Sequence, residues 1–387
     1  MAYVEGRVVH DADSHVMETP NWLVPYADPD VRARMKPLFL SSVKPGEETF
    51  IDDLRRRHAN PVERPAAEAE IMLRKNWSAL GSFVKEDRPR ALDLLGFRTQ
   101  LVFNTFLNNY LCDVEHERDP GFAYGLARAH NRALVDFCRV DRRLIATGYV
   151  PLADFGRARQ MAEEALAMGC RALLVPSRCP SGHSPSHTGL FPVWAIAEEA
   201  GVPILFHVGG GGPLLDRHYF DNGLPLVTDF HGGAENFRSV DYMAIPVPPM
   251  QTLATLIIDG VLDRFPRLKF GVIEQGAVWL PGWMRQLDSA QEAFKKTEER
   301  LRKLSLKPSE YVQRQVRATP YPTEPVGWII EQAGEEVCLF SSDWPHVEGG
   351  RNPVKRFEDG MQGIPERAKD RFYCGNFVDL MGAGLPS

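Results

Sequence analysis

Short apolar runs alternate along the chain with longer segments whose apolar residues recur at helical spacing. The apolar run 7–9 predicts a first strand, and seven further strands are expected at 99–104, 144–151, 170–176, 203–208, 268–274, 315–319 and 337–343. Helices are expected near 66–80, 88–95, 119–140, 155–168, 195–200 and 253–262. Residues 19–63, rich in proline and charge, predict an extended excursion after the first strand.

Eight strands that alternate with helices favour one fold, a single (β/α)8 TIM barrel over residues 1–387. An open, doubly wound sheet is the second alternative, but no Gly-x-Gly-x-x-Gly motif follows the first strand. The chain exceeds the roughly 250 residues of a typical barrel. The excess predicts two long insertions: 19–98, which also holds the first helices, and 209–247, which is expected to cover the substrate.

Composition limits the class of protein more than its chemistry. The chain is 44% hydrophobic and 25% charged with a net charge of -6, and it has no basic run that would indicate nucleic acid or an anionic membrane as a partner. No signal-peptide pattern and no 18-residue apolar span is present. The six cysteines form no Cys-x-x-Cys pair, which predicts reduced thiols in a cytoplasmic protein. A small-molecule substrate and a homo-oligomer, such as a dimer, are the expected partners.

Candidate metal ligands stand at the ends of several predicted strands. Asp13 and His15 lie two residues apart and therefore share a strand face, while His207, Glu274 and Asp343 each follow another apolar run. The carboxyl ends of barrel strands meet at one rim. Each residue alone also fits a solvated strand end, a helix cap or a hydrogen-bonded core side chain. Together they favour a divalent cation, which offsets the cost of burying carboxylates.

Four stretches, taken in order, are shared with a known family: DADSHVME, Phe206-His207, LATLIIDGVLDRFPRLKFGVIEQG and FSSDWPHVEG. Through them nearly the whole chain resembles the amidohydrolase superfamily, in particular the branch related to aminocarboxymuconate-semialdehyde decarboxylase. The resemblance implies one catalytic divalent metal ion, zinc or manganese, held by Asp13, His15, His207 and Asp343. The family often carries His-x-His at the first pair, and an acidic residue such as Asp13 also occurs in members that decarboxylate aromatic acids.

A second departure from the family concerns the general base. Relatives commonly have a histidine at the end of the sixth strand, where this chain has Glu274. Glu274 is therefore a candidate base, and the alternative is an ion pair with Arg285 that only holds the rim together. A histidine could supply the base instead, in the order of preference His231, His346 and His218.

The segment that follows the fifth strand has two further interpretations. The glycines at 209–212 lack the pattern of a phosphate-binding loop, so a tight turn near the metal is favoured over a phosphate site. Arg238, His346 and His218 are candidate substrate-binding residues, with Arg238 able to meet a carboxylate. Packing over the barrel or a dimer contact is the alternative role for 213–247.

Two reactions fit these residues, with Asp343 transferring the proton in either case. Hydrolysis of an amide, ester, lactone or activated C–C bond by a metal-bound hydroxide is favoured, because Glu274 would repel a carboxylate substrate. Non-oxidative decarboxylation of an aromatic or unsaturated carboxylic acid is the alternative. A non-catalytic scaffold is disfavoured, because buried carboxylates without a ligand would destabilise the fold.

Overall fold

Seven strands in the described part of the chain form one parallel sheet in sequence order. The computed structural model describes residues 2–38, 47–117, 119–225 and 239–386. Every residue of these strands is buried, as expected for a parallel sheet covered on both faces. The strands are β1 His10–Val16, β2 Thr99–Asn104, β3 Leu144–Tyr149, β4 Ala172–Leu174, β5 Ile204–His207, β6 Phe270–Ile273 and β7 Val316–Ala318.

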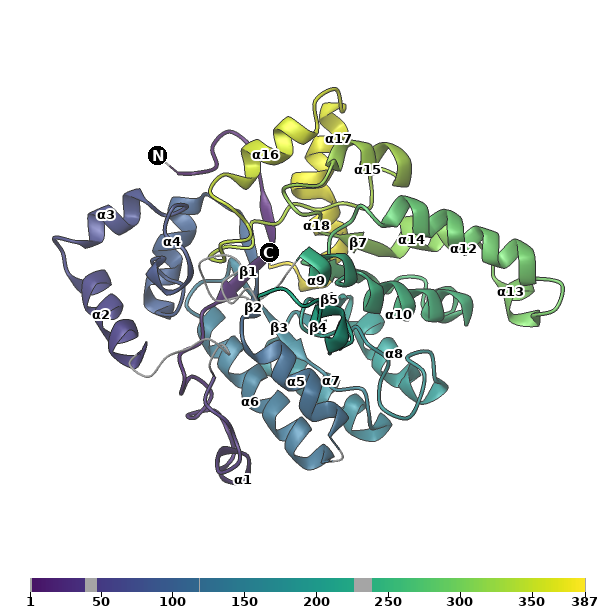
Figure 1. The fold of residues 1–387 in the computed structure, drawn as a ribbon, viewed down its shortest axis with the longest axis horizontal. Coiled ribbons are helices and arrows are strands. Elements are labelled where there is room, and N and C mark those ends of the chain that lie inside the picture. The colour runs from purple at the N-terminus through teal and green to yellow at the C-terminus, as the bar shows by residue number, and fades with distance from the viewer. Residues whose placement is uncertain (1, 39–46, 118, 226–238, 387) are drawn as a thin grey trace.

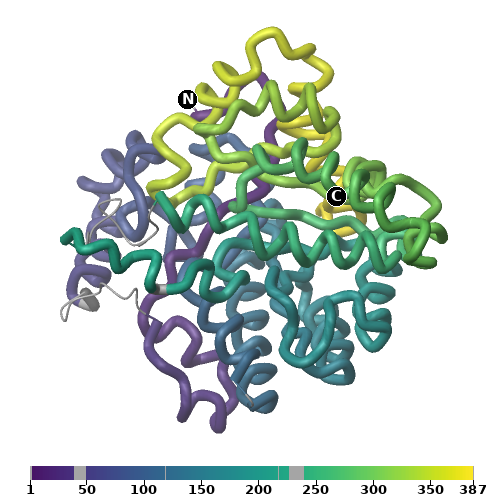
Figure 2. Tube along the Cα trace, turned by 45° about the vertical axis from the view of Figure 1, so that its right-hand side comes forward, coloured from purple at the N-terminus to yellow at the C-terminus, as the bar shows by residue number. Residues whose placement is uncertain are grey.

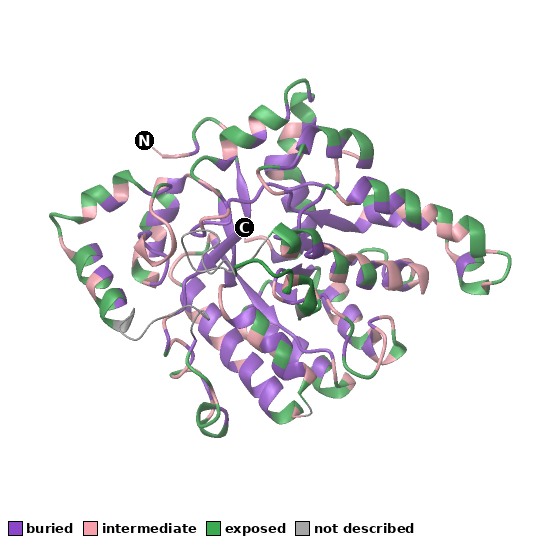
Figure 3. Cartoon of the chain, in the orientation of Figure 1, coloured by how far each residue is buried: buried purple, intermediate pink, exposed green. Residues whose placement is uncertain are grey.

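Helices surround this sheet, with their exposed faces outward and the buried strands at the centre (Figures 1 and 3). They are α1 Pro29–Arg32, α2 Glu47–Ala59, α3 Arg64–Ala69, α4 Arg88–Leu95, α5 Leu107–His116, α6 Pro120–Cys138, α7 Phe155–Met168, α8 Phe191–Ala200, α9 Ser239–Ala244, α10 Val247–Ile258, α11 Val261–Arg264, α12 Leu280–Phe294, α13 Glu299–Lys303, α14 Pro308–Gln315, α15 Val326–Ala333, α16 Pro353–Gly360, α17 Glu366–Asp370 and α18 Asn376–Met381. Short turns of other helix types are η1 Asn76–Ser78, η2 Lys85–Asp87, η3 Thr188–Leu190, η4 Arg217–Phe220, η5 Arg371–Gly375 and η6 Gly382–Gly384. Within the described residues, no helix has both the length and the apolar character that a membrane span requires.

The segment 337–344 connects the two edges of the sheet. Cys338 forms an isolated parallel bridge with Ala318 of β7, and Trp344 forms another with Ser14 of β1. The parallel α/β architecture is therefore confirmed, with seven strands and one bridging segment. The division into a single domain with two insertions stays a prediction.

The segment predicted as an eighth strand, 337–343, pairs through backbone hydrogen bonds with both edges of the sheet but forms only isolated bridges, not a regular strand. The Leu339 amide donates to the Ala318 carbonyl at 3.0 Å, and the Ala12 amide donates to the Phe340 carbonyl at 3.1 Å. The Ser342 amide and hydroxyl donate to the Asp11 carboxylate at 2.8 and 2.7 Å, where a regular strand would pair with a neighbouring backbone. The register of β1 against β2 also shifts between Asp11 and Ser14. At Ser342 a side-chain carboxylate thus takes the place of a backbone partner.

Helices α4 and α7 have the predicted bounds because their ends are encoded locally. The Asp154 side chain accepts from the Arg157 amide at 2.8 Å and caps the start of α7. Gly169 ends α7 and Gly96 ends α4, with φ angles of 111° and 77°, in the left-handed region that glycine adopts without strain. Such signals can be read from a few neighbouring residues.

Other predicted elements are wrong in place or extent. β1 begins at His10 rather than at 7–9, where Val8 is 56% exposed. The segment 19–63 is not extended throughout, since it contains α1 and part of it forms α2, and α5 was not expected at all. The helix predicted at 66–80 ends with α3, and beyond it Asn76 adopts a φ of 53° while its amide donates to the Pro345 carbonyl. Long-range contacts override the helical pattern there.

The first strand, β1, runs beside the C-terminal helices α16 to α18, although the two termini themselves lie apart (Figures 1 and 2). His10 stacks on Phe377 with ring centroids 5.0 Å apart. Arg7 pairs with Glu366 at 2.9 Å and with Asp370 at 3.1 Å. The C-terminal helices therefore hold the strand that carries the first candidate ligands.

A buried carboxyl group in α5 makes the stability depend on pH. Glu115 accepts from the Leu152 amide at 2.6 Å and from the Tyr149 hydroxyl at 3.2 Å, and burial raises its pKa from 4.5 to about 7. Because the folded pKa lies above the unfolded one, its contribution to stability is greatest below pH 4.5 and falls as the pH rises to about 7. The full change corresponds to about 3 kcal/mol.

We therefore expect the melting temperature of Glu115→Gln to rise relative to that of the wild type as the pH increases from 5 to 8, because the amide stays neutral. Thermal melts at several pH values measure this difference. Glu199→Gln, at an exposed position of α8, is the control and should leave the difference constant. A Glu115→Gln difference that does not change with pH would contradict the prediction.

Candidate active site

Three strands and the bridging segment bring ionisable side chains together at one buried site. Asp13 and His15 lie in β1, His207 ends β5, Glu274 directly follows β6, and Asp343 lies in the bridging segment. All five are buried, from 0% exposed at Asp13 to 7% at Glu274 and Asp343. The carboxyl ends of parallel strands meet at one rim, which explains why residues so distant in sequence converge.

The distances divide this cluster into two overlapping sets. Asp13 Oδ1 lies 3.1 Å from His15 Nε2 and 3.3 Å from His207 Nε2, and Glu274 Oε2 lies 3.3 Å from His207 Nε2. Asp343 Oδ1 lies 3.3 Å from His15 Nε2. Within each set the potential ligand atoms are all within 4.8 Å of one another; the first set is Asp13, His15, His207 and Glu274, and the second is His15, Glu274, Asp343 and His346. The four ligands inferred from the resemblance are thus brought together, although they are split between the two sets.

Two imidazole rings are oriented as metal ligands usually are. His15 Nδ1 lies 3.0 Å from the Asn104 carbonyl oxygen, and His207 Nδ1 lies 3.0 Å from the Val208 carbonyl oxygen. A carbonyl only accepts, so each Nδ1 carries a hydrogen and a neutral ring points its Nε2 lone pair at the Asp13 carboxylate. Two lone pairs that face a carboxylate repel it unless a cation lies between them. Asp13 Oδ2 has no hydrogen-bond donor among the described residues. This donor set fits a divalent cation.

Protons and a metal ion would compete for the same atoms. Burial alone lowers the pKa of His15, but Asp13 and Asp343 overcome it and raise the pKa well above its usual value. Burial raises the pKa of Asp13, but His15 and His207 reverse this and hold it below its usual value. The cluster therefore shares a proton when it holds no cation, and metal binding would release that proton.

The backbone is strained at the same place. Glu274 and Asp343 have φ angles of 54° and 49°, and Asn76 is the only other non-glycine residue in the described chain with a positive φ. Such angles are uncommon for residues with a Cβ and concentrate at functional sites. The Glu274 amide donates to Thr319 Oγ1 at 2.8 Å, and the Tyr321 hydroxyl donates to the Glu274 carbonyl at 2.8 Å. These bonds hold the side chain in the cluster.

His346 lies against the candidate ligands. Its Nδ1 is 2.8 Å from Asp343 Oδ1, and its ring stacks on that of His15 with centroids 3.9 Å apart. Its Nε2 is 3.0 Å from Thr105 Oγ1, and the Thr105 amide donates to the buried Glu18 carboxylate at 2.9 Å. Thr105 and Glu18 were not among the candidates predicted from the sequence. Their position after β2 and β1 was the available signal, since Thr105 directly follows β2 and Glu18 lies two residues beyond β1.

The remaining sequence candidates lie elsewhere. His218 is in η4, exposed, and 2.7 Å from Asp216. Arg285 is exposed on α12 and donates to a glutamine side chain of α15, whereas Glu274 lies in the cluster. The predicted candidates His231 and Arg238 lie outside the described residues.

A lysine and a glutamate beside the cluster were also missed. Lys75 Nζ is buried with no hydrogen-bond acceptor among the described residues, and burial lowers its pKa to about 8 while Asp343 and Glu348 raise it. Burial raises the pKa of Glu348 to about 7. A small cavity lined by Asp13, Glu274, Asp343 and Glu348 opens on this side. A positive group therefore stands next to an acidic cavity.

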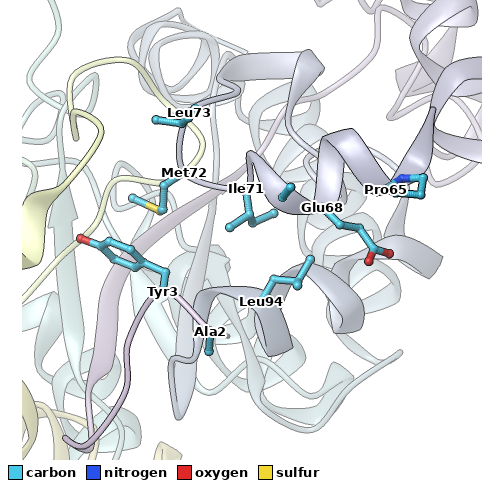
Figure 4. Close-up of a pocket in the computed structure, with 9 residues that line it drawn as sticks. Ala2, Tyr3, Pro65, Glu68, Ile71, Met72, Leu73 and Leu94 are labelled. Carbon is cyan, nitrogen blue, oxygen red and sulfur yellow. The ribbon is translucent and has the colours of Figure 1, made fainter. Parts of the chain in front are cut away.

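A larger pocket, of about 440 Å³, lies between the N-terminal segment and the helices α3 and α4 (Figure 4). Tyr3, Met72 and Leu94 line it with other apolar residues. Its acidic residue, Glu68, is already paired with arginines. Nothing in this lining matches the chemistry of the buried cluster.

Comparisons with known proteins agree with this architecture. Among solved structures, an amidohydrolase from Mycobacterium avium subsp. paratuberculosis K-10 has a TM-score of 0.73 at 23% identity, covering 98% of this chain and 99% of that one. The 5-carboxyvanillate decarboxylase from Sphingomonas paucimobilis has a TM-score of 0.63 at 17% identity, covering 97% and 99%. The 2,6-dihydroxybenzoate decarboxylase from Rhizobium has a TM-score of 0.61 at 17% identity, covering 98% and 99%. These similarities show the fold.

The sequence comparisons give the family. No curated protein sequence matches the chain. A family model described as Amidohydrolase matches residues 30–378, which is most of the chain, and confirms the resemblance found in the sequence. The protein therefore belongs to the amidohydrolase family and is an enzyme of that family.

Proposed function

We propose that this enzyme removes CO2 from an aromatic or unsaturated carboxylic acid in a metal-dependent, non-oxidative reaction. The observation that carries the proposal is the position of Glu274, whose Oε2 lies 3.3 Å from His207 Nε2 within a candidate ligand set. The sequence favours hydrolysis because a Glu274 carboxylate would repel a carboxylate substrate. A Glu274 that shares a divalent cation with Asp13 has its charge offset, and that objection then no longer holds.

Several solved structures with this fold support the choice. The 5-carboxyvanillate decarboxylase of Novosphingobium aromaticivorans was solved with manganese and 3-methoxy-4-hydroxy-5-nitrobenzoic acid. The dihydroxybenzoic acid decarboxylase of Polaromonas was solved with manganese and the inhibitor 2-nitroresorcinol. For this chain we propose by analogy one manganese or zinc ion and a substrate with an unsaturated ring.

The candidate ligands of the ion are Asp13, His15, His207 and Asp343, with Glu274 as a fifth. When bound, the ion would supply positive charge that polarises the carboxylate and a neighbouring hydroxyl of the substrate. The fit rests on the paired Nε2 lone pairs and the Asp13 oxygen described above.

Residues of this chain would bind the substrate and move the proton. The Lys75 ammonium, next to the acidic cavity, suits an anionic substrate group. As the bond between the ring carbon and the carboxyl carbon breaks, its electron pair stays on the ring carbon and CO2 leaves. A proton carried by the Asp343 carboxyl group, whose Oδ1 lies 2.8 Å from His346 Nδ1, would then pass to that carbon.

Hydrolysis of a small carbonyl compound is the second candidate, and the same Asp343–His346 pair favours it. A carboxylate 2.8 Å from an imidazole can also accept a proton from an attacking water. The roles of Glu274 or His231 as base and of Arg238, His346 and His218 in substrate binding stay predictions. So do the cytoplasmic location and the homodimer.

The first test is metal content together with the fate of the carboxyl group. We expect about one manganese or zinc ion per chain, because the two candidate sets share His15 and Glu274 and therefore make one site. Elemental analysis of the purified protein measures the metal. Assays with 2,6-dihydroxybenzoate and 5-carboxyvanillate, with and without chelator, measure CO2 release.

Turnover in oxygen-18 water separates the two reactions. Decarboxylation releases one CO2 per turnover and leaves the organic product without label. Label in the organic product without CO2 would support hydrolysis and reject the decarboxylase proposal. A protein that neither contains nor binds manganese or zinc would reject both reactions as proposed.

A further inference from the structure

Arg88, in the first turn of α4, is a fully buried arginine directly behind the candidate metal site. Its side chain is 0% exposed. One terminal nitrogen donates to the His15 carbonyl at 2.8 Å, and the other donates to Ser14 Oγ at 3.0 Å. The first nitrogen also reaches the Gly81 carbonyl at 3.5 Å. All of these acceptors are uncharged.

Such a group is unusual because a buried cation normally has a carboxylate partner. Arg88 forms no ion pair with any carboxylate of the described residues. Burial lowers its pKa only to about 10, so it remains charged at neutral pH. Its carbon Cζ lies 4.5 Å from the centroid of the Trp344 ring and 5.8 Å from that of Phe137, and these aromatic faces partly offset the cost of burial.

Three of the five contacts of Arg88, those with Ser14, His15 and Trp344, belong to the two segments that carry the candidate ligands. Ser14 and His15 lie in β1 beside Asp13, and Trp344 directly follows Asp343. The two segments also touch through the backbone, because the His15 amide donates to the Trp344 carbonyl at 2.8 Å. The Arg88 guanidinium therefore contacts both segments on the side opposite the cluster.

These contacts of Arg88 are important because regular strand pairing is interrupted at the same place. The register of β1 shifts just before Ser14, and the segment around Trp344 is joined to β1 by one isolated bridge and a few backbone hydrogen bonds rather than by a regular ladder. A small slip between the segments would change the 3.3 Å separation of His15 Nε2 and Asp343 Oδ1. The planar guanidinium can hold a carbonyl, a hydroxyl and an aromatic face at once, which a lysine ammonium does less well.

We propose that Arg88 is a positioning residue that keeps the Asp13–His15 and Asp343 segments in register so that they can share one metal ion. The inference rests on the proposed metal site and assigns Arg88 no contact with substrate. Arg88→Met should therefore weaken metal binding while the barrel stays folded. The metal affinity of Arg88→Lys should lie between that of Arg88→Met and that of the wild type, because lysine keeps the charge but lacks the planar guanidinium.

The experiment is titration of the full chain with Mn²⁺ alone, followed by electron paramagnetic resonance of free and bound ion. We expect Arg88→Met to raise the Kd for Mn²⁺ about 10- to 100-fold, the usual effect of losing a group that orients metal ligands. The spectrum of the remaining bound Mn²⁺ should also change, because the ligand geometry is altered. Thermal melts of each variant record stability separately.

Arg317→Lys is the matched control. Arg317 is also buried, at 2% exposed, but it donates to Asp379 and to the carbonyls of Gln313 and Val316 rather than to a segment with candidate ligands. The Arg317→Lys substitution should lower the melting temperature and leave the Kd for Mn²⁺ unchanged. If Arg88→Met does not fold, Arg88→Lys and Ser14→Ala provide the test, since each weakens only part of the contact.

The outcomes separate this inference from the proposed function. Wild-type protein that binds Mn²⁺ while the Arg88 variants bind it equally well would overturn the positioning role and leave the metal site intact. An equal rise in the Kd of Arg317→Lys would show that the effect reflects a general loss of stability, and it would also overturn the positioning role of Arg88. A wild type that binds no divalent ion would reject the metal site itself, and this inference with it.

Discussion

Asp343→Asn is expected to lower turnover by at least about 10³-fold while the protein keeps its fold. A single positioned acid or base contributes about 10²- to 10⁴-fold, and asparagine cannot exchange a proton with His346. Asp343 Oδ1 also lies 3.3 Å from His15 Nε2, so the substitution removes a candidate metal ligand as well. The amide has the shape of the carboxylate, and the backbone bond from the Asp343 amide to the Asp13 carbonyl, 3.0 Å long, should remain.

Three measurements check this result: turnover of an aromatic acid that the wild type accepts, bound metal by elemental analysis, and the melting temperature. Asp11→Asn is the control, because Asp11 is a buried carboxyl group of β1 that lies outside both ligand sets. Burial raises its pKa to about 7, so the amide resembles its protonated form and turnover should change far less. Near-normal turnover with full metal content in Asp343→Asn would refute the role assigned to it.

Glu274→Gln is expected to weaken Mn²⁺ binding about 10- to 100-fold or more and to lower turnover about 10²- to 10⁴-fold. The structure places Glu274 Oε2 3.3 Å from His207 Nε2 and 4.0 Å from His15 Nε2, among the candidate ligand atoms. A neutral amide would leave part of the metal charge without an offset. Both the Kd for Mn²⁺ and the rate at saturating Mn²⁺ should be measured across pH.

The pH profile distinguishes a ligand from a base. If Glu274→Gln keeps normal metal affinity and loses the acidic limb of the pH–rate profile, Glu274 is the general base and not a ligand. Glu324→Gln is the control: this buried carboxylate caps the amides of Ala277 and Val278 at 2.9 and 3.2 Å, close by in the fold but outside both ligand sets. It should lower stability and leave the metal affinity unchanged.

Local sequence patterns predicted the presence of the strands better than the residues at which they begin and end. The bounds of β2 and α4 agree with the sequence-based prediction, because one carries a continuous buried run and the other ends at a left-handed glycine. The prediction failed where distant residues decide the local structure. The expected eighth strand is reduced to isolated bridges in the segment where the Ser342 amide bonds to the Asp11 carboxylate. The helix expected through residue 80 is cut short before Asn76, whose amide bonds to the Pro345 carbonyl.

The candidate ligands were accessible from sequence because of a rule of topology. Parallel strands bring their carboxyl ends to one rim, so polar residues that directly follow apolar runs converge without knowledge of any contact. This is why Asp13, His15, His207 and Asp343 were expected at one rim, where the structure brings their side chains together. Glu274 was placed at the rim as well, but its charge was weighed without the histidines that lie beside it.

The sequence by itself determined the alternation of strands and helices, the family and the residues that gather at the rim. The tertiary structure alone decided the ring orientation of His15 and His207, the place of His346 beside Asp343, and the partners of Arg88. The physical reason is the range of the forces involved. Hydrophobic periodicity and helix caps act between near neighbours in the chain, whereas hydrogen bonds and charge pairs in a buried site join residues hundreds of positions apart, as between Ser342 and Asp11.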